Sequence, residues 1–227
     1  MTGTTLEAAI AGLAAAGESD RAANSAAYHK ADRPYLGVPV PVITDLAKRW
    51  RETLDVKGRV SLADRLWRTN IHEARIAAAK LLTQARIRDD GPVWQLIASW
   101  VPEFDAWAIA DHACDAGGRR LVADPLRINE VESWVTAESL WTRRAALIIT
   151  LPWTKQNFPK PEDLAIRDRV LGWAATMGDD PDWFIQKAIA WWLRDLSKHD
   201  APRVRAFLGA HGERMKPFAR KEAGKYL

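Results

Sequence analysis

The chain has 227 residues, of which 48% are hydrophobic, so it has enough apolar material for a continuous core and is not an intrinsically disordered protein. The formal net charge of +4 permits a polyanionic partner without demonstrating one. A single cysteine, Cys114, excludes an internal disulfide and a cysteine-rich zinc site. It is compatible with a reducing cytoplasm, where we expect the protein to work.

The sequence gives no sign of membrane association. No apolar run approaches the roughly 20 residues that a membrane-spanning helix needs. Residues 1–16 are apolar, but they lack a basic flank and include Glu7. We therefore interpret this segment as an amphipathic helix and not as a signal peptide.

Apolar residues recur at helical spacing almost throughout the chain, and no segment clearly shows the pattern of a strand. The breaks fall at clusters of Gly, Pro and Asp. This pattern predicts an all-α protein. The expected helices cover residues 5–16, 20–30, 40–54, 62–69, 71–86, 92–100, 105–116, 129–137, 140–151, 161–177, 183–198, 202–211 and 217–227.

From residue 62 onward, the predicted helices come in pairs joined by short loops. A pair occupies about 35–45 residues, which is the period of HEAT-like helical repeats. We therefore predict one domain over residues 1–227, built of helix pairs stacked into a concave α-solenoid, with a monomer as the default state. An ordinary helical bundle remains the alternative, because the repeats share rhythm and little sequence identity.

The predicted helix over residues 183–198 has two contrasting faces. Its apolar stripe, which should face the core, consists of Ile185, Ile189, Trp192 and Leu196. The opposite side combines indoles with cations and consists of Trp183, Lys187, Trp191, Arg194 and Lys198. Aromatic rings beside positive charge are expected where a nucleic acid backbone is held. The alternative is that Trp191 packs under a neighbouring helix while the cations are solvated.

The predicted helix over residues 105–116 places an indole beside a carboxylate. Trp107 and Asp111 are four residues apart, so they are neighbours on one face. The opposite face is small and apolar and consists of Ile109, Ala113 and Ala116. A carboxylate next to an indole suits the stabilisation of an oxocarbenium-like sugar during glycosidic bond cleavage. Alternatively, Asp111 is a surface acid or the partner of an arginine.

The predicted helix over residues 140–151 carries an arginine in its apolar stripe. Arg144 falls among Leu140, Leu147 and Leu151, and a buried charge without a partner is costly. Its partner could be Asp111 or a DNA phosphate. A structural salt bridge without a catalytic role is the alternative.

Other chemistries find little support. The five histidines lack metal-ligand spacing, and we interpret them as surface residues or as supporting neighbours of a site. The sequence has no phosphate-cradling glycine loop and no nucleophilic serine elbow. We therefore expect neither a metal nor a cofactor.

Four segments together resemble the DNA alkylation repair family of HEAT-repeat alkylpurine DNA glycosylases, and the resemblance spans nearly the whole chain. Near the start, Tyr28-His29-Lys30 and the turn Tyr35-Leu36-Gly37 are similar to the family's first motifs. Trp107 and Asp111 match its Trp-x-x-x-Asp element. The last two matching segments are Leu140-Trp141-Thr142-Arg143-Arg144 and Phe184-Ile185-Gln186-Lys187-Ala188-Ile189-Ala190-Trp191-Trp192-Leu193-Arg194.

The resemblance implies a function and a set of site residues. It implies hydrolysis of cationic N3- or N7-alkylated purines from double-stranded DNA, without flipping the base into a pocket. Asp111, Trp107 and Trp191 would be catalytic and would meet on the concave face. The residues expected near the DNA are Tyr28, Arg144 and Arg194 from the resemblance, and Lys187 from the cationic helix face. The motifs do not distinguish N3-methyladenine, N7-methylguanine and a bulkier adduct as the preferred lesion.

One segment departs from the family pattern. Residues 38–44 are mostly apolar, whereas relatives often carry polar and basic side chains there for phosphate contacts. Two other functions are kept as alternatives. A non-enzymatic HEAT-repeat DNA-binding module would keep the cations without needing Asp111. A protein-interaction scaffold would not need the aromatic and cationic face of residues 183–198.

Overall fold

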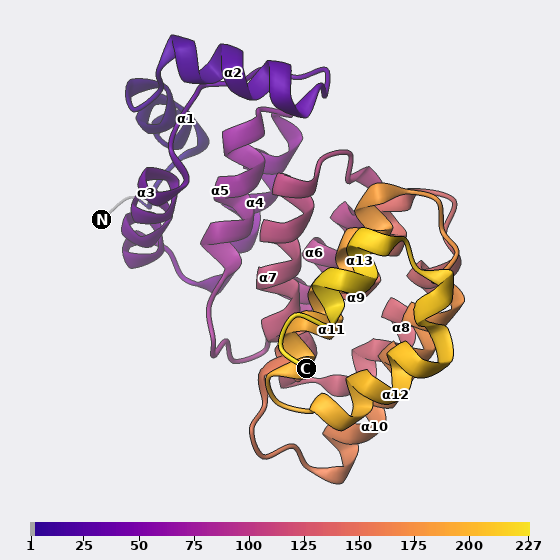
Figure 1. Cartoon of the computed structure of the whole chain (residues 1–227). Coiled ribbons are helices and arrows are strands. Elements are labelled where there is room, and N and C mark those ends of the chain that lie inside the picture. The colour runs from indigo at the N-terminus through magenta and orange to yellow at the C-terminus, as the bar shows by residue number, and fades with distance from the viewer. Residues whose placement is uncertain (1–2) are drawn as a thin grey trace. The chain divides into compact units, whose positions relative to one another are not determined.

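The computed structural model describes residues 3–227, which form α-helices and short 3₁₀ helices (Figure 1). No strand occurs among these described residues, so the prediction of an all-α protein is confirmed. The chain divides into two compact units, the first ending at Ala123 and the second spanning Asp124–Leu227. The interpretation of residues 1–227 as a single domain stays a prediction.

The first unit is organised around one buried helix, α5. This helix packs against α3, α4 and α7, and every residue in it except Lys80 is buried. The elements of this unit are α1 (Leu6–Ala15), α2 (Ser19–His29), α3 (Val40–Thr53), α4 (Val56–Arg68), α5 (His72–Leu82), α6 (Gly91–Trp100), η1 (Val101–Glu103) and α7 (Trp107–Ala123).

The second unit is organised around α11, which packs against α9, α12, α13 and the 3₁₀ helix η4. Its elements are η2 (Pro125–Arg127), α8 (Ile128–Glu132), η3 (Ser133–Thr136), α9 (Leu140–Ile148), η4 (Leu151–Lys155), α10 (Pro161–Thr176), α11 (Trp183–Ser197), α12 (Ala201–His211), η5 (Gly212–Arg214) and α13 (Pro217–Ala223).

The apolar stripe predicted for α11 is confirmed. The four stripe residues are fully buried: Ile185, Ile189, Trp192 and Leu196. The Trp192 indole N–H donates to the Thr150 hydroxyl at 3.2 Å, which satisfies its one polar group inside the core. This packing leaves the opposite side of α11 for other contacts.

Several helix boundaries differ from the prediction; for example, α7 continues to Ala123, beyond residue 116. Two of the differences have identifiable reasons. Helix α4 begins at Val56, well before residue 62, because the Asp55 carboxylate caps it by accepting the Gly58 N–H at 2.7 Å. Helix α5 ends at Leu82, before residue 86, because the carbonyl groups that follow bind the buried Arg120 of α7. Its guanidinium donates to the backbone oxygens of residues 84 and 85, the latter at 3.0 Å.

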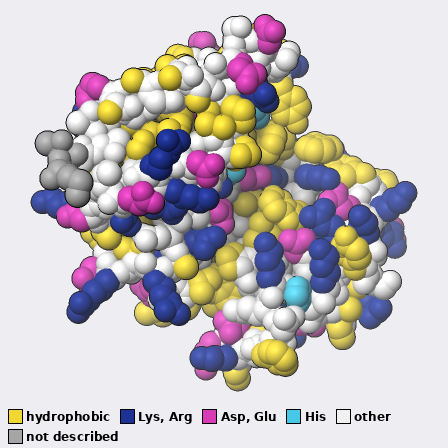
Figure 2. Space-filling model, turned by 90° about the vertical axis from the view of Figure 1, so that its left-hand side faces the viewer, with side chains coloured by type: hydrophobic (Ala, Val, Ile, Leu, Met, Phe, Trp, Pro, Cys, Tyr) yellow, Lys and Arg dark blue, Asp and Glu magenta, His cyan; other side chains and the backbone are white. Residues whose placement is uncertain are grey.

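The surface carries charges of both signs. On the face drawn in Figure 2, Lys and Arg side chains are interspersed with Asp and Glu side chains. Any contact to a phosphate group would therefore depend on individual cations and on the partners that they already have. Among residues 3–227, no helix combines the length and the apolar character needed to cross a membrane.

Candidate functional site

Helix α7 presents the predicted indole and carboxylate from consecutive turns. Trp107 is its first residue, Asp111 follows one turn later, and both are half-buried. The other side of α7 packs into the core as predicted, through the fully buried Ile109, Ala113 and Ala116. The core contacts therefore fix the helix so that Trp107 and Asp111 share its opposite side.

The Trp107 ring lies against two aromatic side chains from the end of α2. The Tyr28 ring meets it edge-on, with centroids 6.3 Å apart and an interplanar angle of 87°. The His29 ring lies closer, at 5.6 Å and 48°. Tyr28 is 68% exposed, which leaves most of its ring open to a partner. The structure thus brings Tyr28, Trp107 and Asp111 into one region of the first unit.

Further rings support this group from behind. The His72 ring lies 4.6 Å from that of His29, and the Tyr35 ring lies 4.8 Å from that of His72. The rings of His29 and Tyr35 are nearly parallel, with an interplanar angle of 4°. A run of neighbouring rings therefore connects Trp107 through His29 to the buried His72. We call Tyr28, His29, Tyr35, His72 and Trp107 the ring cluster.

The two histidines of the ring cluster are uncharged near neutral pH. Burial lowers the pKa of His72 to about 3, and the nearby Arg33 guanidinium adds to this effect. Burial also lowers the pKa of His29, and the nearby Arg33 guanidinium adds to this effect. The Arg33 guanidinium forms an ion pair with the Asp105 carboxylate. The rings beside Trp107 thus contribute packing surface without charge.

A buried carboxylate holds the segment between α2 and α3. Glu73 is 2% exposed and accepts the backbone N–H groups of Leu36 and Gly37, each at 2.8 Å. Gly37 has φ = 74°, and an added Cβ would lie 2.2 Å from the Glu18 carbonyl oxygen. This turn therefore requires glycine, and the Glu73 anchor fixes the segment that carries Tyr35.

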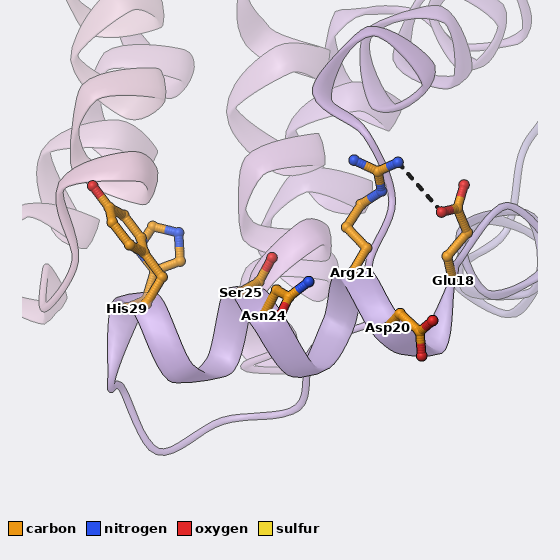
Figure 3. Close-up of a pocket in the computed structure, with 7 residues that line it drawn as sticks. Glu18, Asp20, Arg21, Asn24, Ser25 and His29 are labelled. Carbon is orange, nitrogen blue, oxygen red and sulfur yellow. Dashed lines mark hydrogen bonds and ion pairs between the residues drawn. The ribbon is translucent and has the colours of Figure 1, made fainter.

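Helix α2 also borders a shallow polar groove of about 440 Å³. The residues that line it belong to α2 and its N-cap, and all except Tyr28 are labelled in Figure 3: Glu18, Asp20, Arg21, Asn24, Ser25, Tyr28 and His29. The charged groups among them are two carboxylates and one guanidinium, and Arg21 pairs with Glu18 at 3.3 Å. An acidic excess disfavours phosphate, so Tyr28 and not the groove is the candidate for DNA contact.

In the second unit, Trp191 lies among charged side chains. It is half-buried, and its indole N–H donates to the Asp195 carboxylate at 3.0 Å. The Arg194 guanidinium contacts the same carboxylate at 3.4 Å. Asp195 therefore fixes the Trp191 ring and links it to one of the predicted DNA-binding residues.

The predicted DNA-binding cations of α11 are both paired with Glu222 of α13. The Lys187 ammonium lies 2.5 Å from one Glu222 carboxylate oxygen, and the Arg194 guanidinium lies 2.6 Å from the other. The sequence indicated the cations but not this carboxylate. Glu222 is the only acidic residue in the basic segment that follows residue 215. This isolated position was the one feature of the sequence that could have indicated a pairing role for it.

Arg144 occupies a different environment. It is 4% exposed, and its guanidinium donates to the backbone carbonyl of Phe184 in the first turn of α11 at 2.9 Å. The Phe184 ring lies 4.7 Å from that of Trp141 in α9. Arg144 thus joins α9 to α11. Its role at the DNA, like the grouping of Trp191 with Trp107 and Asp111, stays a prediction.

Solved structures of several bacterial proteins are similar to this chain. A protein described as a predicted DNA alkylation repair enzyme from Enterococcus faecalis has a TM-score of 0.76 and 22% identity, covering 93% of this chain and 96% of its own. AlkD2 from Streptococcus mutans has a TM-score of 0.62 and 18% identity, covering 83% and 90%. The protein smu.31 from Streptococcus mutans UA159 has a TM-score of 0.61 and 18% identity, covering 83% and 92%. At these identities the likeness shows the fold alone.

Sequence comparison adds the family. No curated protein matches the chain, but the family model described as DNA alkylation repair enzyme matches residues 9–227. That match covers nearly the whole sequence and includes both units. The resemblance inferred from the four sequence segments is thereby confirmed, and the chain belongs to the DNA alkylation repair enzyme family.

Proposed function

We propose that the protein is a DNA glycosylase that hydrolyses the N-glycosidic bond of cationic N3- or N7-alkylated purines in double-stranded DNA. The observation that carries the proposal is the pairing of Trp107 and Asp111 on consecutive turns of α7, beside the uncharged ring cluster. Family membership supports DNA as the substrate. We expect the protein to act as a monomer in the cytoplasm.

The reaction suits a site without a strong general acid. An alkylated purine is already positively charged, so the electrons of the breaking N-glycosidic bond neutralise the base as it leaves. The sugar becomes oxocarbenium-like, and water adds to its C1′ carbon. The water then loses a proton, for which the Asp111 carboxylate is the proposed acceptor. The products are a neutral alkylated purine and an abasic deoxyribose.

The proposed catalytic residues stabilise the positive charge that develops on the sugar. The Asp111 carboxylate stabilises the positive sugar by electrostatic attraction and orients the water. Trp107 and Trp191 offer aromatic faces to the same developing cation. None of these roles requires a deep pocket, so the base need not be flipped into the protein.

The proposed DNA-side residues hold the backbone. Tyr28 offers an exposed ring at the edge of the Trp107 region. Lys187 and Arg194 supply cations for phosphate oxygens, and both side chains are partly exposed. Arg144 is the fourth candidate. Because it is buried and already bonded to the Phe184 carbonyl, we expect its direct contribution to be the smallest.

The test is single-turnover release of base from a duplex that contains one N7-methylguanine, followed by detection of the abasic site. The proposal expects release by the unaltered protein well above the spontaneous rate. A protein that binds the duplex without releasing base would instead be the non-enzymatic DNA-binding module. A protein that does neither would favour the scaffold alternative.

A further inference from the structure

Helix α13 and the residues after it lie along the face of α11 that bears the cations. The Phe218 ring stacks near the Trp183 ring, with centroids 5.9 Å apart and an interplanar angle of 22°. At the other end, the Lys198 ammonium lies 4.7 Å from the centre of the Tyr226 ring. Glu222 lies four residues from each of these aromatic residues. It is therefore held over α11 by contacts on both sides.

Glu222 is the better-sheltered partner in its two ion pairs. Its side chain is 16% exposed, against 38% for Lys187 and 27% for Arg194. An ion pair in such a partly buried position is screened less than one on the open surface. The cations thus remain open to solvent on one side while sharing a carboxylate on the other.

The local charges cancel. Lys187 and Arg194 carry two positive charges, and Glu222 and Asp195, which contact them, carry two negative charges. The face that the sequence suggested to be cationic therefore has no net charge from these four side chains. A DNA phosphate gains little from Lys187 and Arg194 unless one of these carboxylates is displaced.

We infer that Glu222 occupies the phosphate-binding position of Lys187 and Arg194 in the free protein and is displaced by a backbone phosphate when duplex DNA binds. Carboxylate and phosphate oxygens accept from the same ammonium and guanidinium donors, so each can replace the other. This inference rests on the proposed function. Asp195 is not the displaced group, because its carboxylate also holds the Trp191 indole.

The arrangement makes Glu222 a residue that weakens contact with the DNA backbone. Phosphate contacts carry no information about sequence or damage, and they supply most of the binding to undamaged DNA. A carboxylate that competes for two cations lowers this affinity for undamaged DNA. Binding to undamaged duplex is thus the property that Glu222 should control.

The experiment compares Glu222→Gln with Asp168→Asn on an undamaged duplex over a range of salt concentrations. Both variants raise the net charge by one and remove a carboxylate from an ion pair between helices, since Asp168 pairs with Arg203 at 2.8 Å. Only Glu222→Gln releases Lys187 and Arg194. It should bind roughly five- to tenfold more tightly at ~0.1 M salt, with a slope of log affinity against log salt steeper by about one. Asp168→Asn should stay close to the unaltered protein.

A third variant separates charge from fold. Glu222→Asp keeps the negative charge and should bind duplex as weakly as the unaltered protein, and thermal melting checks that each variant is folded. Glu222→Gln binding that equals that of Asp168→Asn, or that is weaker than that of the unaltered protein, would overturn the inference. The unaltered protein would then still bind duplex and release base, so the proposed function would stand. Absence of duplex binding by every form would overturn both.

Discussion

The two units present their key tryptophans in opposite ways. In the first unit, Trp107 lies beside Tyr28 and His29 and belongs to a cluster of uncharged rings. In the second, Trp191 is bonded to Asp195 and lies on a helix whose cations are paired with carboxylates. An indole can thus be fixed by the packing of other rings or by a hydrogen bond to a charged group. Packing is insensitive to salt, whereas ion pairs respond to it.

This difference matches the two tasks of the proposed reaction. A sugar that becomes positively charged is stabilised by aromatic faces and one carboxylate, which the first unit supplies in Trp107 and Asp111. A DNA backbone needs cations, for which Lys187 and Arg194 of α11 are the proposed source once Glu222 is displaced. Substitutions in the first unit should therefore change rates, and substitutions on α11 should also change binding.

The largest effect is expected at Asp111. Asp111→Asn is nearly isosteric but removes the negative charge, so single-turnover base release should fall by on the order of 10²–10³ while duplex binding is retained. Asp115→Asn is the control, because Asp115 lies one turn later on α7, is exposed, and pairs only loosely with Arg119 at 3.8 Å. Equal rates for these two variants would remove Asp111 from the mechanism.

A smaller loss is expected when one aromatic face is removed. Trp191→Ala should slow base release by roughly five- to thirtyfold, which corresponds to about 1–2 kcal/mol of cation–π stabilisation. Duplex affinity should also decline, because the aromatic wall that Trp191 offers to the sugar is lost. Trp192→Ala, the neighbouring control, should instead cost about 3–5 kcal/mol of folding free energy, since Trp192 is fully buried. If Trp191→Ala changes the free energy of unfolding but not the rate of base release, Trp191 has no part in the reaction.

A milder effect should follow from changes to the ring that supports Trp107. His29→Ala removes an aromatic neighbour and should lower the rate of base release by roughly two- to tenfold. His29→Phe should restore the rate, because the ring acts by packing and not by charge. The rates are measured at two salt concentrations, and the ratio of the His29→Ala rate to the rate of the unaltered protein should be the same at both. A failed rescue by phenylalanine would point to a chemical role for the imidazole.

A separate effect concerns the dependence of stability on pH and not the rate of the reaction. The pKa of His72 is about 3 in the folded protein and near 6.5 when unfolded, so the unfolded chain binds the extra proton between these values. Above about pH 6.5, His72 is neutral in both states and does not oppose folding. As the pH falls from 6.5 toward 3, protonation of the unfolded chain increasingly lowers the free energy of unfolding. Thermal melting of His72→Phe should therefore depend less on pH in this window than melting of the unaltered protein. An identical dependence would show that His72 is not the responsible group.

Periodicity was sufficient for the all-α class and for the buried faces of single helices, because helical faces are encoded locally. It identified the buried stripe of α11 and the apolar side of α7, both of which the structure confirms. It also placed Trp107 and Asp111 on one side of their helix. The family resemblance then supplied roles that spacing alone left open.

The partners of these residues could not be predicted, because they come from distant parts of the chain. Spacing showed that Lys187 and Arg194 avoid the core, but not that Glu222 covers them. It likewise gave no sign that Glu73 anchors Gly37. Helical periodicity defines which side of a helix turns outward. What lies against that side depends on tertiary packing.

Helix α13 has only seven residues, which is far below the about 12–15 needed for a helix to persist alone in water. Its backbone hydrogen bonds therefore exist because Phe218 and its neighbours dock on α11. The rate of amide hydrogen exchange in this short helix should consequently report whether α13 is docked on α11. If a bound duplex loosened the docking, exchange would accelerate at Ala219 and Ala223, two fully buried residues, before any other helix of the second unit was affected.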